Sequence, residues 1–239
     1  MPSPIVGSSL RMTLLGEFAL INDRSVLPIG LAGQRLLAYL ALRRGPVRRT
    51  QIAEALWLAG TGARAAANLR AAMSRLPRPG GRSLVDTAAG HLTLSPAIDT
   101  DLRACTALMQ QQDTPGTTDL RGLSDDLLPS WDDEWLVLER EQHRQRRLHA
   151  LERLSGRLCE DGRYEDAVCA ALAAVAGEPL RESAHRCVIR AHLLEGNSAE
   201  ALRQYELYRR LIRADLGLSP SPALRALVAP LLGRPADDE

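Results

Sequence analysis

The chain has 239 residues, of which 30 are basic and 29 acidic, and its formal net charge is +1. That length allows one large domain or two ordinary ones, and the 45% hydrophobic and 25% charged residues are typical of a water-soluble globular protein. The longest apolar run, residues 167–177, is far shorter than the roughly 18 residues of a bilayer-spanning helix. No signal peptide is visible at the N-terminus, so we expect a cytoplasmic protein without membrane contact.

Cysteine and lysine usage excludes several kinds of chemistry. The four cysteines, Cys105, Cys159, Cys169 and Cys187, show no CxxC spacing, which predicts reduced and mostly buried thiols. All 30 basic residues are arginine, so any step that requires lysine is excluded. The glycine-containing loop at residues 60–64 therefore cannot be a Walker A phosphate site and is predicted to be a turn between helices.

Charge is distributed unevenly along the chain. Residues 1–100 hold 12 arginines against 5 acids, a balance of +7, whereas residues 101–239 hold 18 arginines against 24 acids, a balance of −6. This asymmetry predicts two domains and makes a polyanion a candidate partner of the basic half.

The first 100 residues predict a short sheet, three helices and a hairpin, in that order. Alternating apolar residues indicate a strand over residues 11–21, a turn at 22–25 and a return strand at 26–29. The first helix is expected at 34–44, and the second begins after Thr50 as its N-cap. The third is expected at 62–76 and is ended by Pro77. Residues 84–87 and 92–94 then indicate a β-hairpin.

The remaining residues predict helices almost throughout. A short helix through residue 111 leads to a linker-like stretch at 114–126, and a long helix is expected over 133–160. Shorter helices follow at about 164–176, 181–195, 198–214 and 221–232. Gly162 and Ala167 recur 34 residues later as Gly196 and Ala201. A spacing of 34 residues is the period of tetratricopeptide repeats. We therefore predict a stacked all-helical domain in which each helix pair buries its apolar face on a neighbour.

The third predicted helix carries the clearest functional pattern. Its apolar stripe leaves Arg64, Asn68 and Arg75 in one row, with small alanines between them. Arginine can bind guanine and asparagine can read adenine, and small residues would let the helix lie deep in a major groove. A solvated basic face explains this helix alone equally well, but a helix between a helix turn and a hairpin is typical of winged helix-turn-helix proteins. Further basic or polar residues lie around it, namely Arg48, Arg49, Thr50, Arg70, Ser74, Arg78, Arg82 and His91.

Other candidate sites are better explained as structural. His185, Cys187 and His192 lack a third ligand at metal spacing, so no metal or cofactor is expected. The acidic residues at 132–134 lie where a helix begins, and no nucleophile–base pair can be identified, so an enzyme is not expected. The charged run at 139–147 favours a salt-bridged solvent face over a second DNA contact.

Longer segments resemble a known family of bacterial regulators. LLPSWDDEWLVLEREQHRQRRLHALERL at 127–154 and the following PLRESAH and AEALRQYE segments resemble the bacterial transcriptional activator domain of the Streptomyces antibiotic regulatory protein (SARP) family. LLGEFAL, GQRLLAYLAL, ARAAANLRAAMSRL and GHLTL are similar to the OmpR-like winged helix that precedes it. Two departures are His91, where the family's wing commonly has an aromatic residue, and Pro77, which shortens the recognition helix.

The resemblance implies a mainly α fold with a small β component. Residues 1–100 would form an OmpR-like winged helix-turn-helix with a small antiparallel sheet, and residues 101–239 a tetratricopeptide-like activator domain, as in a small member of the family. The implied protein is a nucleoid-associated activator that binds promoter direct repeats as a homodimer or DNA-assembled dimer, recruits RNA polymerase through its sigma factor or core, and controls a secondary-metabolite cluster.

The predicted site residues divide into two groups. Arg64, Asn68 and Arg75 are expected to read bases, and the eight surrounding residues named above to contact the DNA backbone. Two alternatives stay open at this stage. One is a helical-repeat adaptor whose basic N-terminal domain docks an acidic protein, and the other is a repressor of the same architecture.

Overall fold

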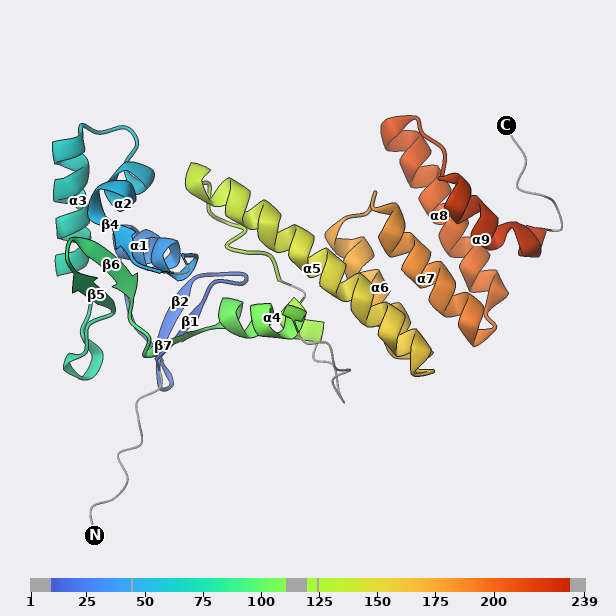
Figure 1. The fold of residues 1–239 in the computed structure, drawn as a ribbon, viewed down its shortest axis with the longest axis horizontal. Helices are drawn as coiled ribbons and strands as arrows, with labels where there is room; N and C mark the ends of the chain where they lie inside the picture. Colours follow the sequence, from blue (N-terminus) through green and yellow to red (C-terminus); the bar gives the residue numbers. More distant parts are fainter. Residues whose placement is uncertain (1–9, 44, 111–119, 124, 233–239) are drawn as a thin grey trace, which may run out of the picture. The chain divides into compact units, whose positions relative to one another are not determined.

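The computed structural model describes residues 10–43, 45–110, 120–123 and 125–232. It divides the chain into two compact units (Figure 1). The first unit comprises Met1–Ala107 with Asp125–Gln142, and the second comprises Leu108–Ser124 with His143–Glu239. The mainly α fold with a small β component, predicted from the sequence, is confirmed.

The first unit begins with a four-stranded sheet of order β3-β2-β1-β7. Its strands are β1 (Leu10–Thr13), β2 (Ala19–Asn22), β3 (Ser25–Val26) and β7 (Ile98–Thr100). The expected continuous strand over residues 11–21 is interrupted, because the Leu14 amide bonds to the Asp101 carboxylate at 2.9 Å and Gly16 adopts a φ of 79°. Since β7 runs parallel to β1, the sheet is mixed and not purely antiparallel.

Three helices pack beside this sheet. They are α1 (Leu31–Ala41), α2 (Arg49–Leu56) and α3 (Gly62–Ser74). Their apolar stripes meet in one core, to which Leu36, Ile52 and Leu69 contribute fully buried side chains. A Cβ at Gly33 would lie 3.0 Å from Leu76 Cδ2, so glycine permits the close approach of α1 to the end of the α3 segment. The predicted three-helix arrangement is therefore confirmed.

A three-stranded wing completes the helix-turn-helix. Its strands are β4 (Val47–Arg48), β5 (Val85–Ala88) and β6 (His91–Leu94), in the order β4-β6-β5. A 3-10 turn at Pro79–Gly81 precedes β5, and the hairpin turns at Ala89 and Gly90, whose φ angles of 46° and 78° suit a two-residue turn. The Thr50 N-cap is wrong: Arg48 caps α2, because β4 pairs with β6 and the Arg49 amide bonds to the Gly90 carbonyl at 3.1 Å.

Residues 125–142 pack into the core of this unit, although the sequence placed them in the second half of the chain. Leu128 donates its amide to the Leu14 carbonyl at 2.9 Å. Trp131 stacks on Phe18 with ring centroids 5.9 Å apart, and Leu127, Leu128 and Leu136 are buried in the shared core. The limits of the compact units thus differ from the domain boundary predicted at residue 100. The division of function between the two predicted domains stays a prediction.

The second unit is helical. Helices α4 (Asp101–Gln110) and α5 (Glu134–Glu160) each begin in the first unit and end in the second. The others are η2 (Leu120–Leu123), α6 (Tyr164–Gly177), α7 (Glu182–Glu195), α8 (Ser198–Leu216) and α9 (Pro222–Leu232). The 34-residue repeat has structural counterparts: Gly162 and Gly196 have φ angles of 72° and 89°, and Ala167 and Ala201 are both fully buried.

The charged run at residues 139–147 is a salt-bridged face in part. Glu139 pairs with Arg43, and Arg144 pairs with Glu178. His143 and Arg147, however, are 7% and 3% exposed and belong to the interior, because the helix turns them toward the core and not toward solvent. Over the described segments, no helix is both long and apolar enough to cross a bilayer.

Candidate nucleic-acid interface

Helix α3 presents one buried stripe and one exposed face. Ala65, Leu69 and Ala72 are at most 4% exposed. On the outward side Arg64 and Arg75 are exposed, whereas Asn68 is half-buried. The helix begins at a side-chain cap, since Thr61 Oγ1 accepts from the Arg64 amide at 3.4 Å. Its last residue is Ser74, and Arg75 is the C-cap, two residues before Pro77.

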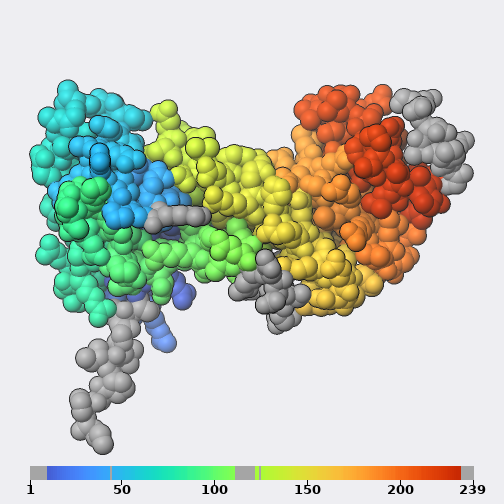
Figure 2. All heavy atoms as spheres, in the orientation of Figure 1, coloured from blue at the N-terminus to red at the C-terminus, as the bar shows by residue number. Residues whose placement is uncertain are grey.

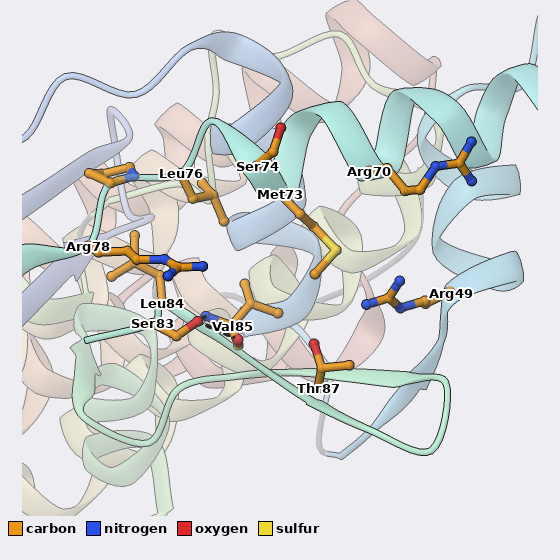
Figure 3. Close-up of a pocket in the computed structure, with 11 residues that line it drawn as sticks. Arg49, Arg70, Met73, Ser74, Leu76, Arg78, Ser83, Leu84, Val85 and Thr87 are labelled. Carbon is orange, nitrogen blue, oxygen red and sulfur yellow. Dashed lines mark hydrogen bonds between the residues drawn. The ribbon is translucent and has the colours of Figure 1, made fainter. Parts of the chain in front are cut away.

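A second row of α3 faces the wing. Figure 3 shows Arg70, Met73 and Ser74 above strand β5, with Arg49 from α2 and Arg78 from the following loop at the two ends of a pocket. The pocket has a volume of about 320 Å³. It is lined by Arg49, Arg70, Met73, Ser74, Leu76, Pro77, Arg78, Ser83, Leu84, Val85 and Thr87.

The remaining predicted contacts lie on the segments that flank this pocket. Arg48 and Thr50 are exposed at the start of α2, and Arg82 is exposed before β5. His91 is half-buried opposite Arg48 in the strand pairing, and its Nδ1 lies 3.0 Å from the Ala89 carbonyl oxygen. Figure 2 shows the cyan and green atoms of this part of the first unit as one continuous surface.

This surface carries uncompensated positive charge. Within the described part of the chain, none of its seven arginines forms an ion pair: Arg48, Arg49, Arg64, Arg70, Arg75, Arg78 and Arg82. Arginines elsewhere differ, because Arg35 of α1 pairs with Asp133 and Arg181, the N-cap of α7, pairs with Glu152. A face of unpaired guanidinium groups is suited to a polyanionic ligand.

Thr87 and Val85 are pocket residues that sequence reasoning missed. Side chains alternate along a strand, so Val85 and Thr87 share one face of β5 while Asp86 points to the other. This alternation was available from the sequence once the hairpin was predicted. Which helix lies opposite these two side chains, however, depends on the tertiary fold.

The other candidate sites have structural explanations. His185 is fully buried, with Nε2 2.9 Å from the Pro179 carbonyl and Nδ1 2.9 Å from Gln204 Nε2. Burial raises the pKa of Cys187 to about 11, which keeps it a neutral thiol. Asp133 pairs with Arg35 and accepts from Trp135 Nε1 at 3.0 Å. Among the residues that the structure describes, no three metal-ligating side chains form a cluster.

Comparisons with known proteins agree with this architecture. The family model of the bacterial transcriptional activator domain matches residues 120–232. The chain is 28% identical to the regulatory protein AfsR of Streptomyces griseus and 30% identical to that of Streptomyces coelicolor, over 98% and 92% of its own length. It spans about a quarter of these relatives, 26% and 24% of their respective lengths. The matched family is of a transcriptional-regulator type.

A solved structure shares the fold. Mycobacterium tuberculosis EmbR, determined in complex with a low-affinity phosphopeptide, superposes with a TM-score of 0.71 over 96% of this chain and 67% of that chain. The sequence identity is 22%, so the match concerns the fold alone.

Proposed function

We propose that this chain, a SARP-type regulator with a winged helix-turn-helix and a bacterial transcriptional activator domain, binds promoter DNA in a sequence-specific manner and activates transcription. The observation that carries the proposal is the set of seven arginines on β4, α2, α3 and the segment between α3 and β5, none of which forms an ion pair within the described residues. Duplex DNA is a regular polyanion, and its major groove admits an α-helix.

The outward row of α3 would read the bases. Arg64 and Arg75 are exposed at the two ends of the helix, and Asn68 lies between them. Ala67 and Ala71 on the same side leave room for close approach to base edges. Arg48, Arg49, Thr50, Arg70, Ser74, Arg78, Arg82 and His91 would contact the sugar–phosphate backbone.

The proposal extends to the partners of the second unit. Its tetratricopeptide-like helix pairs offer surfaces for protein contacts, and by family resemblance these would engage RNA polymerase and a second copy of the chain on promoter direct repeats. Direct repeats require a head-to-tail arrangement, since a two-fold dimer matches a palindrome. The same resemblance supports a cytoplasmic regulator of a secondary-metabolite cluster.

Arginine-to-alanine variants test base readout. DNA sites are first selected from a random library with the wild-type chain, and binding of Arg64→Ala and Arg75→Ala is then measured on selected and mutated sites. A base-reading arginine contributes about 1–3 kcal/mol of discrimination, so each variant should bind the selected site more weakly and show relaxed specificity at one position.

Arg24→Ala is the matched control. Arg24 is exposed in the turn between β2 and β3, and its removal changes the net charge equally. Unchanged specificity in both α3 variants would refute the recognition-helix assignment. Wild-type binding that occurs only at low salt and shows no sequence preference would favour the adaptor function.

A further inference from the structure

Strand β3 is an open edge of the four-stranded sheet. It ends the order β3-β2-β1-β7, and within the described residues no strand pairs with its outer side. The Leu27 amide donates to the Leu20 carbonyl at 2.8 Å, and hydrogen-bonded pairs alternate with non-bonded pairs along an antiparallel ladder. Val26, which lies opposite Ile21, therefore directs its own N–H and C=O away from β2 and toward the open edge.

An uncharged groove lies beside this edge, and we call it the β3 groove. It has a volume of about 410 Å³ and is lined by residues 18–20 and 26–30 together with Gln34, none of which carries a charge. Val26 lines the groove and is 66% exposed, and Leu31 is 64% exposed. Residues 26–33 contain no charged side chain at all. Contiguous exposed apolar surface marks interaction sites, whereas scattered apolar side chains do not.

The β3 groove also offers hydrogen-bonding groups. Gln34 Nε2 donates to the Ile29 carbonyl at 2.8 Å, which holds the side-chain amide in place. Gln34 Oε1 accepts no hydrogen bond within the described residues. This oxygen and the outward N–H and C=O of Val26 lie beside the apolar side chains of Phe18 and Leu20. An added strand needs this combination, because its backbone bonds to the sheet edge and its alternate side chains fill pockets.

The chemistry of the β3 groove decides between occupants. A nucleic-acid strand does not fit, because no basic side chain lines the groove. A second copy of the chain does not fit either. If it paired antiparallel at Val26, it would set its Arg24 opposite Pro28 and its Asp23 opposite Ile29, so that charged side chains met an uncharged surface. Pro28 also has no N–H, so such a ladder would end after one hydrogen-bonded pair.

We propose that the β3 groove binds an extended, uncharged segment of a partner protein, which joins the sheet as a strand beside β3. The segment exchanges two hydrogen bonds with the backbone of Val26. Its apolar side chains enter the groove at every second position, since alternate side chains of a strand share one face. The β3 groove shares no residue with the predicted DNA contacts, so the proposal does not depend on DNA binding.

Selection from a displayed library of random linear peptides tests the proposal with the full-length chain. The enriched peptides should lack charged residues at their centre and carry apolar residues at alternate positions. A synthetic copy of the enriched sequence, blocked at both ends, should bind the wild type and slow the amide hydrogen exchange of Val26. The same peptide, N-methylated at the residue that faces Val26, should bind about tenfold more weakly because it lacks one hydrogen bond.

Val26→Pro separates peptide binding from stability. Proline removes the outward N–H but no bond to β2, and sheet edges tolerate proline, so the melting temperature should stay unchanged while the peptide no longer binds. Val26→Lys is a second variant that keeps the N–H, and it should also abolish binding because it places a charge at the sheet edge. Leu58→Lys is the matched control. Leu58 is equally exposed, at 66%, and lies between α2 and α3, so this variant should bind the peptide as the wild type does.

Three results would overturn the proposal. One is a library from which no sequence is enriched, and another is an enriched peptide that binds both Val26 variants as tightly as the wild type. The third is a wild-type dimer in light scattering that Val26→Lys abolishes, which would assign the edge to a second copy of the chain. Site selection on random DNA should give the same result for Val26→Lys and the wild type, so a failure of DNA binding and a failure of peptide binding are distinguishable.

Discussion

At the scale of the residue, the role of each arginine depends on the groups that surround it. Arg35 and Arg181 lie beside carboxylates and form ion pairs. Among the described residues, Arg140 bonds only to backbone carbonyls, which lie in the segment before α5. Arg70 and Arg78 have neither kind of partner within the described residues, which leaves their full charge for a ligand. All 30 basic residues are arginine, so composition alone does not show which of them form ion pairs.

His185 makes stability depend on pH. Burial lowers its pKa, and the Pro179 carbonyl and Glu182 only partly oppose this. The folded pKa therefore lies below the unfolded value of about 6.5, so the neutral form stabilises the fold fully above that value. This stability should be lost as the pH falls from about 6.5 through the folded pKa.

Urea unfolding between pH 8 and pH 5 checks this prediction. His185→Gln should show a smaller loss of unfolding free energy on acidification than the wild type. His149→Gln, which changes an exposed histidine of α5, is the control and should follow the wild type. Parallel pH profiles for wild type and His185→Gln would contradict the prediction.

At the scale of the element, the start of α5 is fixed by one side chain. Arg140 donates to the carbonyls of Leu127, Leu128 and Trp131 at 3.0, 2.6 and 2.8 Å. These bonds hold the segment at residues 127–131 against the helix that follows it. They place Trp131 where it stacks on Phe18.

Removing this guanidinium should destabilise the first unit. Hydrogen bonds from a charged group contribute about 1.5–3 kcal/mol, so Arg140→Ala should lower the free energy of unfolding by roughly that amount. Arg146→Ala, at an exposed position of the same helix, should change it by less than about 0.5 kcal/mol. Equal unfolding free energies for the two variants would show that the carbonyl contacts do not matter.

At the scale of the whole molecule, the first unit is assembled from two separate stretches of chain. Leu127, Leu128 and Leu136 are fully buried in the core built by residues 10–98. Their burial contributes about 1.5–3 kcal/mol each, a large share of the 5–15 kcal/mol by which a domain is stable. A first unit that ended near residue 100 would lack this part of its core.

Truncated chains test this division. A chain of residues 1–142 should unfold cooperatively and keep its near-ultraviolet circular dichroism. A chain of residues 1–107 should lose both properties and expose apolar surface to a hydrophobic dye. If the shorter chain melted cooperatively at the same temperature as the longer one, residues 125–142 would not be part of the folding unit.

Local patterns predicted most of the elements. The apolar stripe of α3 indicated which face is buried, and the 34-residue repeat indicated the pairing of α6 with α7 and of α8 with α9. The Thr50 cap was wrong because a partner distant in sequence, the Gly90 carbonyl, fixed the start of α2. The short strands β4 and β7 were missed for the same reason, since strands of two or three residues depend on what pairs with them.

The sequence by itself determined the order of the elements, the repeat and the basic face of α3, because periodicity and residue chemistry are local properties. Only the tertiary structure decided which arginines stay unpaired, that Arg49, Arg70 and Arg78 meet around one pocket, and that residues 125–142 complete the first core. Each of these depends on contacts between segments far apart in the chain. A linear pattern does not specify such contacts.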